Sequence, residues 1–334
     1  AVATDLASVG VVDPFSILSL YMGGPEQLKA YADGAPVFTD DRMTLEFSAP
    51  RELHNRNAGE NGATLRGLLK GGGPEVVRQA LDGAGAFQWR TRAEMLTKAD
   101  VHQQAYADYT RALAVDPNNT IVLDGLVKGA LLLQRASEAL THVTVDTPET
   151  RTPARLVARS KLLAANSLRD DAIAAAREAV VLAPQSPIGL EQLASLFADS
   201  GDTVQLDAAV TELRRVAPQR AATEFYAAVA AFLHGDADAA VASAERALAL
   251  DANYTPTYDL IGAAYTRLGR LDPARQAFQK SLSFDAHDST AYENLGVLEF
   301  NAGNRSLAAK YFSEALWLVP DSRTARQGLA QSRP

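Results

Sequence analysis

Glycines separated by 34 residues constrain the fold of this chain more than any other feature. Gly235, Gly269 and Gly303 follow one another at 269 − 235 = 34 and 303 − 269 = 34. The same step relates three further series: Pro184, Pro218, Ala252, Ala286 and Pro320; Ala240, Ala274 and Ala308; and Ala176, Val210, Ala244, Phe278 and Phe312. A fixed period of this size is typical of stacked structural repeats.

Each period has the pattern of two helices. Apolar residues recur at steps of three and four, as in Tyr258, Ile261, Tyr265 and Leu268, which predicts a helix with one buried stripe. Gly269 is then expected to end the first helix, because glycine adopts the left-handed conformation at the least cost. Each helix pair leaves an apolar face that only the next pair can cover.

The final period carries its key residues in a recognisable order. They are Tyr292, Leu295, Gly296, Gly303, Ala308, Phe312, Ala315 and Pro320. This order resembles the tetratricopeptide repeat, a helix-turn-helix unit. The resemblance implies an all-α, right-handed α-solenoid of about seven helix pairs, which we place at 86–119, 120–152, 153–186, 187–220, 221–254, 255–288 and 289–322. The second pair matches least, since nothing between Glu138 and His142 reproduces the small and aromatic positions.

Two flanking segments complete the array of residues 86–322. Residues 56–85 are expected to be a linker and a leading helix, and the glycine-rich stretch at 68–81 fits a turn before a helix better than a cofactor loop. Residues 323–334 are expected to form a polar helix that caps the solenoid, with Asp321 or Ser322 as its N-cap.

In this family the first helix of each pair lines a concave groove. The residues that we place there are Glu191, Phe225, Val229, Phe232, Asp259, Glu293 and Val297. Acidic and apolar side chains suit a basic or apolar segment of a partner protein, and they disfavour a clamp for a terminal carboxylate, which needs cationic and amide donors. The competing interpretation is that these residues pack within their own repeats or lie on a solvated face.

Composition narrows the possible functions. The net charge of −8 and a hydrophobic content of 47% describe a folded chain without the basic surface that nucleic-acid binding requires. No cysteine is present, and no segment has the roughly 20 apolar residues of a membrane span. The five histidines fall in different repeats, so we expect no metal, no cofactor and no catalytic site in this chain.

The first 55 residues do not follow the repeat. The stretch "TDDRMTLEFSAPR", residues 39–51, resembles the C-terminal end of bacterial spermidine-synthase-like domains, with Met43 in place of the usual proline. The resemblance implies a small α/β remnant at 1–55 whose catalytic residues lie upstream of this chain. Asp40 and Asp41 are adjacent on an extended segment and point to opposite faces, which favours a structural role over paired acid–base catalysis.

These patterns favour a non-enzymatic scaffold that binds a partner segment or docks partner subunits. Two alternatives stay open. The chain could be the regulatory or recruiting end of a spermidine-synthase-like enzyme, tethered to a membrane protein through its parent, or it could be a structural assembly or coat subunit. The sequence does not indicate a compartment.

Overall fold

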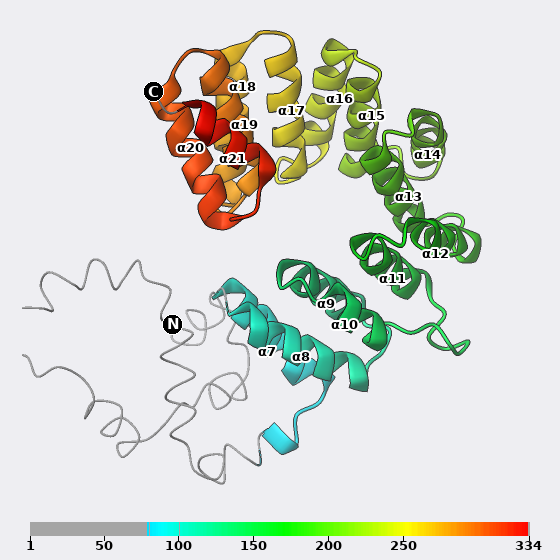
Figure 1. The fold of residues 1–334 in the computed structure, drawn as a ribbon. Helices are drawn as coiled ribbons and strands as arrows, with labels where there is room; N and C mark the ends of the chain where they lie inside the picture. The colour runs from blue at the N-terminus through cyan, green and yellow to red at the C-terminus, as the bar shows by residue number, and fades with distance from the viewer. Residues whose placement is uncertain (1–78, 80, 100, 333–334) are drawn as a thin grey trace, which may run out of the picture. The chain divides into compact units, whose positions relative to one another are not determined.

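A computed structural model describes residue 79, residues 81–99 and residues 101–332. These residues form fifteen helices and no strand (Figure 1). The predicted synthase-like remnant at 1–55, with Asp40, Asp41 and the "MTLEF" strand, lies outside the described residues, as does most of 56–85. The chain divides into two compact units, one ending at Asn166 and the other beginning at Ser167.

The helices follow the predicted repeat spacing. In the first unit they are α7 (Ala86–Lys98), α8 (His102–Val115), α9 (Thr120–Leu132), α10 (Ala136–His142) and α11 (Pro153–Ala165). In the second they are α12 (Arg169–Leu182), α13 (Pro187–Ser200), α14 (Thr203–Val216), α15 (Ala221–Leu233), α16 (Ala237–Leu250), α17 (Pro256–Arg267), α18 (Leu271–Phe284), α19 (Ser289–Asn301), α20 (Arg305–Leu318) and α21 (Arg323–Ser332). The prediction of an all-α repeat solenoid is confirmed.

One residue in the turn of each repeat from 120 onwards is left-handed. Gly201, Gly235, Gly269 and Gly303 have φ between 68° and 90°. Gln134 and Ser167 hold the corresponding places with φ of 56° and 62°. The turn is therefore conserved in geometry along the chain even where the sequence offers no glycine.

A buried residue, alanine in every case but one, lies near the start of each second helix. The residues at this position are at most 3% exposed, and they are Ala105, Ala139, Ala172, Leu206, Ala240, Ala274 and Ala308. The expectation that repeat 120–152 lacks this position is wrong, because Ala139 is fully buried there. Four residues later Val143, also fully buried, takes the place of the aromatic residue.

Repeat 120–152 differs in the length of its second helix. Helix α10 has only seven residues, against 14 in α8, α12 and α14. The buried Arg155 of α11 donates to the carbonyl oxygens of His142, the last residue of α10, of Thr144 just beyond it, and of Pro117. Its guanidinium satisfies backbone groups that a longer helix would have bonded internally.

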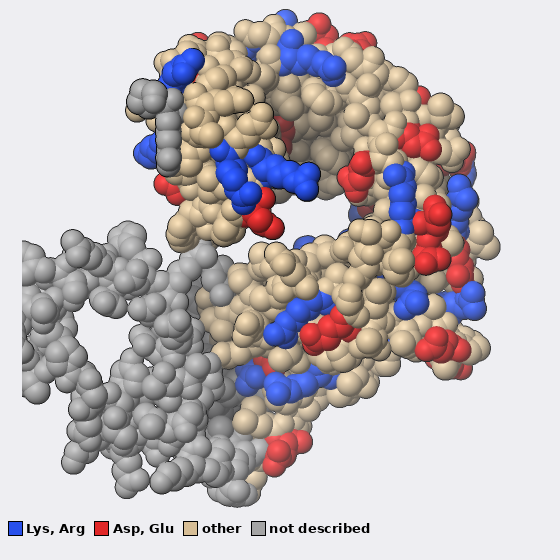
Figure 2. Space-filling model, in the orientation of Figure 1, with Lys and Arg blue, Asp and Glu red and all other residues tan. Residues whose placement is uncertain are grey.

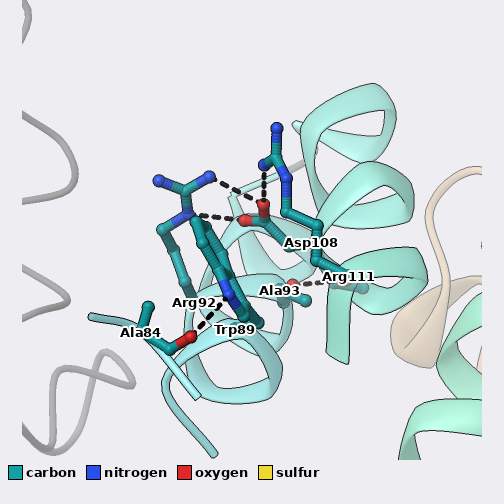
Figure 3. A network of polar contacts seen from close by, with 7 residues as sticks. Ala84, Trp89, Arg92, Ala93, Asp108 and Arg111 are labelled. Carbon is teal, nitrogen blue, oxygen red and sulfur yellow. Dashed lines mark hydrogen bonds and ion pairs between the residues drawn. The ribbon is translucent and has the colours of Figure 1, made fainter. Parts of the chain in front are cut away.

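The first helix pair is held together by an ion-pair network (Figure 3). Asp108 of α8, 0% exposed, accepts from Arg92 of α7 at 2.5 and 2.7 Å and from Arg111 at 2.7 Å. The ring of Trp89 lies within cation–π distance of both guanidinium groups, 5.0 and 4.8 Å from its centroid, and its Nε1 donates to the carbonyl of Ala84. The sequence patterns gave no indication of this network.

Helix α21 closes the second unit by packing on α20 and α19. Ser322 is its N-cap, since the Ser322 Oγ accepts from the backbone N–H of Ala325 at 3.1 Å. Gly328 lies against the ring of Phe312, and an added Cβ there would come within 2.3 Å of it. Close packing of this helix therefore depends on the absence of a side chain at position 328.

Candidate functional site

The first helices of the second unit form its inner side. Successive first helices pack on one another from α13 through α15, α17 and α19 to α21, whereas successive second helices do not pack to the same extent. A stack whose first helices lie closer together curves toward them. All seven predicted groove residues lie on these helices: Glu191 on α13; Phe225, Val229 and Phe232 on α15; Asp259 on α17; and Glu293 and Val297 on α19.

The two glutamates already have partners within the chain. Glu191 is paired with Arg220, the residue before α15. Glu293 accepts from the hydroxyl of Ser322, the residue before α21, at 2.5 Å. Both side chains therefore join one repeat to the next. Less acidic surface is available to a partner than the predicted groove residues imply.

The aromatic residues of α15 are partly buried. The ring of Phe225 meets those of Tyr226 and Tyr254 edge-on, at centroid distances of 5.2 and 5.5 Å. Burial raises the pKa of the Tyr226 hydroxyl well above its ordinary value. Phe232 lies under the guanidinium of Arg267 of α17, which is 5.0 Å from the ring centroid. Val229, on α15 like Phe232, is half-buried.

Asp259 differs from the other two acidic residues of the predicted groove. Its carboxylate accepts from Ser281 at 3.0 Å and lies close to Asp288, the N-cap of α19. Burial, followed by the charge of Asp288, raises the pKa of Asp259 to about 7. No Lys or Arg of the described residues forms an ion pair with it.

Val297 borders a cavity of about 340 Å³ between α19 and α21. Phe300 adds apolar surface to its wall, and Asn301, Arg323 and Gln327 add hydrogen-bond donors. Arg323 has no carboxylate within ion-pair distance among the residues described. The residues of α21 were not among the predicted groove residues. Helix α21 begins 34 residues after α19, so the repeat period could have identified it as a further first helix.

Across 81–99 and 101–332 no group of three or more His, Cys, Asp or Glu side chains is arranged to hold a metal ion. No helix in this part of the chain has both the length and the apolar character needed to cross a bilayer. On the face in Figure 2, Lys and Arg are interspersed with Asp and Glu over the described surface.

Comparison with known proteins agrees with the helix arrangement. Residues 255–288, which comprise α17 and α18, match the family model of the tetratricopeptide repeat. The chain has a tetratricopeptide-repeat fold. The sequence matches no curated protein.

Solved structures share this fold at low sequence identity. A thermophilic tetratricopeptide-repeat protein of Thermus thermophilus is 19% identical, with a TM-score of 0.50 over 54% of this chain and 98% of that one. A chain of the APC/C hetero-tetramer Cut9-Hcn1 is 15% identical, with a TM-score of 0.56 over 98% of this chain and 64% of that one. A tetratricopeptide-repeat protein of Parabacteroides merdae is 14% identical, with a TM-score of 0.55 over 74% of this chain and 98% of that one. These neighbours establish the fold, and none of them supports the synthase-like resemblance of residues 1–55.

Proposed function

We propose that this chain is a non-catalytic scaffold that binds an extended segment of a partner protein along the inner side formed by α13, α15, α17, α19 and α21. The tetratricopeptide-repeat fold supports a role in protein–protein interaction. The observation that carries the proposal is the cavity between α19 and α21, which combines apolar walls with hydrogen-bond donors on the inner side of the stack.

The lining of this cavity favours a particular partner chemistry. Val297, 37% exposed, and Phe300 offer apolar contact, while the guanidinium of Arg323 and the amide of Gln327 offer donors. No carboxylate lines this cavity. We therefore expect a segment with an apolar side chain next to an aspartate or glutamate, because a carboxylate pairs favourably with an arginine that has no other anionic partner.

Binding of an immobilised library of 12-residue peptides tests this function. Peptides with adjacent acidic and apolar residues should bind the wild-type chain, and Arg323→Glu should weaken that binding at least about tenfold through charge repulsion. Val297→Asp should weaken it comparably by placing a charge in the apolar wall. Lys310→Glu is the matched control, because it makes the same charge change at an exposed position on the second helix α20.

Two outcomes would contradict peptide binding at this cavity. If the bound peptides are indifferent to both Arg323→Glu and Val297→Asp, the partner does not use this cavity. Acidic peptides that respond equally to Lys310→Glu would indicate attraction to net charge alone. The synthase-associated alternative stays a prediction, since residues 1–55, on which it rests, lie outside the described residues. The coat-subunit alternative also stays a prediction, and it is distinguished by defined higher-order particles in native mass spectrometry.

A further inference from the structure

Four consecutive repeat junctions of the second unit use the same two positions. One lies in the first turns of a first helix, and the other, 29 residues later, precedes the next first helix. The pairs are an ion pair of Glu191 with Arg220, an aromatic pair of Phe225 with Tyr254, the two acids Asp259 and Asp288, and a hydrogen bond of Ser322 to Glu293. Only the junction of Asp259 with Asp288 places two groups of like charge together.

The two carboxylates have more acceptor oxygens than there are hydrogen-bond donors around them. The Ser281 Oγ lies 3.0 Å from the Asp259 Oδ2 and 3.3 Å from the Asp288 Oδ2, but its single proton serves one of them at a time. The Asp288 Oδ1 accepts from the backbone N–H groups of Thr290 and Ala291 at 2.9 and 3.1 Å. The Asp259 Oδ1 is buried and has no hydrogen-bond partner.

Among the described residues, no Lys or Arg forms an ion pair with Asp259 or Asp288. The pair borders a cavity of about 360 Å³ whose third ionisable group is Asp285 of the α18–α19 connection, and neither Lys nor Arg lines it. His287 of the same connection lies 3.9 Å from Asp285. Helices α15 and α16, which also pack against α17, contribute no residue to this cavity.

We propose that Asp259 and Asp288 form a proton-dependent joint between repeats 255–288 and 289–322. The Oδ1 of Asp288 already accepts from two backbone N–H groups, whereas the Oδ1 of Asp259 has no partner, so the proton of the pair is assigned to Asp259. Protonated Asp259 is neutral and supplies the O–H that the pair lacks, which favours packing of α17 against α19. Loss of that proton sets two partly buried charges against each other and favours opening of the joint.

The direction of the pH effect follows from the raised pKa of Asp259. Its ordinary value is 3.8 and its value in the folded chain is about 7. The favourable contribution is therefore complete below about pH 4, is lost as the pH rises to about 7, and changes no further above that. Helices α19 to α21 should be held more firmly in weak acid than at pH 8.

Hydrogen exchange of the full chain at pH 5.5 and 8.5, corrected for intrinsic rates, tests the joint. In the wild type, protection of α19–α21 should fall on the order of tenfold more than protection of α13 and α14. In Asp259→Asn this difference should fall to within about twofold, because the amide donates without carrying a charge. Glu293→Gln, a charge-removing change at the next junction, should leave the wild-type difference intact.

Three results would overturn the proposal: a wild type with no excess change in α19–α21, an Asp259→Asn chain that retains the wild-type change, or a Glu293→Gln chain that loses it. Circular dichroism establishes whether each variant is folded. If Asp259→Asn does not fold, Asp288→Asn decides, because asparagine is an equally good N-cap and removes the other charge of the pair. The test involves no partner, so its outcome is independent of the proposed peptide binding.

Discussion

At the scale of single residues, the space around a glycine decides whether a side chain is tolerated. Gly262 and Gly129 both lie inside first helices. A Cβ on Gly262 would come within 2.5 Å of the Phe278 ring, whereas one on Gly129 would meet Tyr106 at an ordinary 3.6 Å. The same residue type therefore fills a steric requirement in one repeat and is only a weak helix former in the other.

Opposite effects of alanine are expected at these two glycines. Gly262→Ala should lower the free energy of unfolding by about 1–3 kcal/mol, since the buried Phe278 ring has to shift. Gly129→Ala should raise it by about 0.5–1 kcal/mol, because alanine favours the helix. Urea denaturation followed by circular dichroism measures both. Destabilisation by Gly129→Ala would contradict the packing described for α9.

The left-handed turn residue leads to a second prediction at this scale. Gln134 has φ of 56° and is exposed, so Gln134→Gly should stabilise the chain by about 1 kcal/mol by relieving backbone strain. Gly269→Ala, at the corresponding turn with open space around it, should destabilise it by about the same amount. Thermal unfolding of the two variants compares them. If both changes act in the same direction, backbone conformation is not the cause.

At the scale of helices, buried ion pairs join neighbouring helices and fix which polar side chains face one another. Asp108 joins α8 to α7, and Glu299 joins α19 to α18 through Arg275. Both carboxylates are 0% exposed. Removing one partner of such a pair leaves the other buried without compensation.

Asp108→Asn should therefore destabilise the first helix pair by about 3–5 kcal/mol. Asp124→Asn is the control, because the Asp124 pair with Lys128 is exposed and should contribute at most about 1 kcal/mol. Hydrogen exchange in α7 and α8 reports the loss directly. Equal effects of the two substitutions would show that the network of Figure 3 adds nothing beyond a surface pair.

Glu299 gives the second unit sensitivity to acid. Burial alone would raise the pKa of Glu299, but donation from Arg275 at 2.5 Å and Asn304 at 2.6 Å lowers it below 4.5. Its stabilising contribution is therefore present above pH 4.5 and is lost as the pH falls through the lowered value. This dependence is opposite in sign to that of Asp259.

Glu299→Gln should cost about 1.5–3 kcal/mol at pH 7, and the deficit should shrink as the pH falls from 5 to 3. Urea midpoints of the wild type and the variant at pH 7, 5 and 3 measure it. A deficit that stays constant down to pH 3 would show that Glu299 is not ionised in the folded chain.

At the scale of the whole molecule, the chain falls into two units, and within each unit a helix packs mainly on the helices nearest to it in sequence. In such a stack a local change should spread only through adjacent interfaces. Gly262→Ala should thus reduce hydrogen-exchange protection in α15–α20 and leave α7–α9 unchanged. Uniform loss of protection over all fifteen helices would indicate a single cooperative unit instead.

Much of this architecture was predictable because the repeat appears directly in the sequence. Gly235, Gly269 and Gly303 set the period, and the helix pairs follow it. The left-handed Gln134 could not be predicted, since glutamine has no preference for that conformation. The pairing of Glu191 with Arg220 was equally hidden, because residues 29 apart meet only once the helices are stacked. The predicted groove residues lie on first helices, and the groove itself stays a prediction, but Glu191 and Glu293 pair within the chain rather than standing free for a partner.

The stacking of Trp89 between Arg92 and Arg111 also provides a built-in optical probe. The sequence contains two tryptophans, Trp89 in the first unit and Trp317, 60% exposed, in the second. Their emission should differ, since one indole lies against two guanidinium groups and the other faces water. A Trp317→Phe chain would leave a fluorescence signal from the first unit alone, so the melting of that unit can be followed without any label.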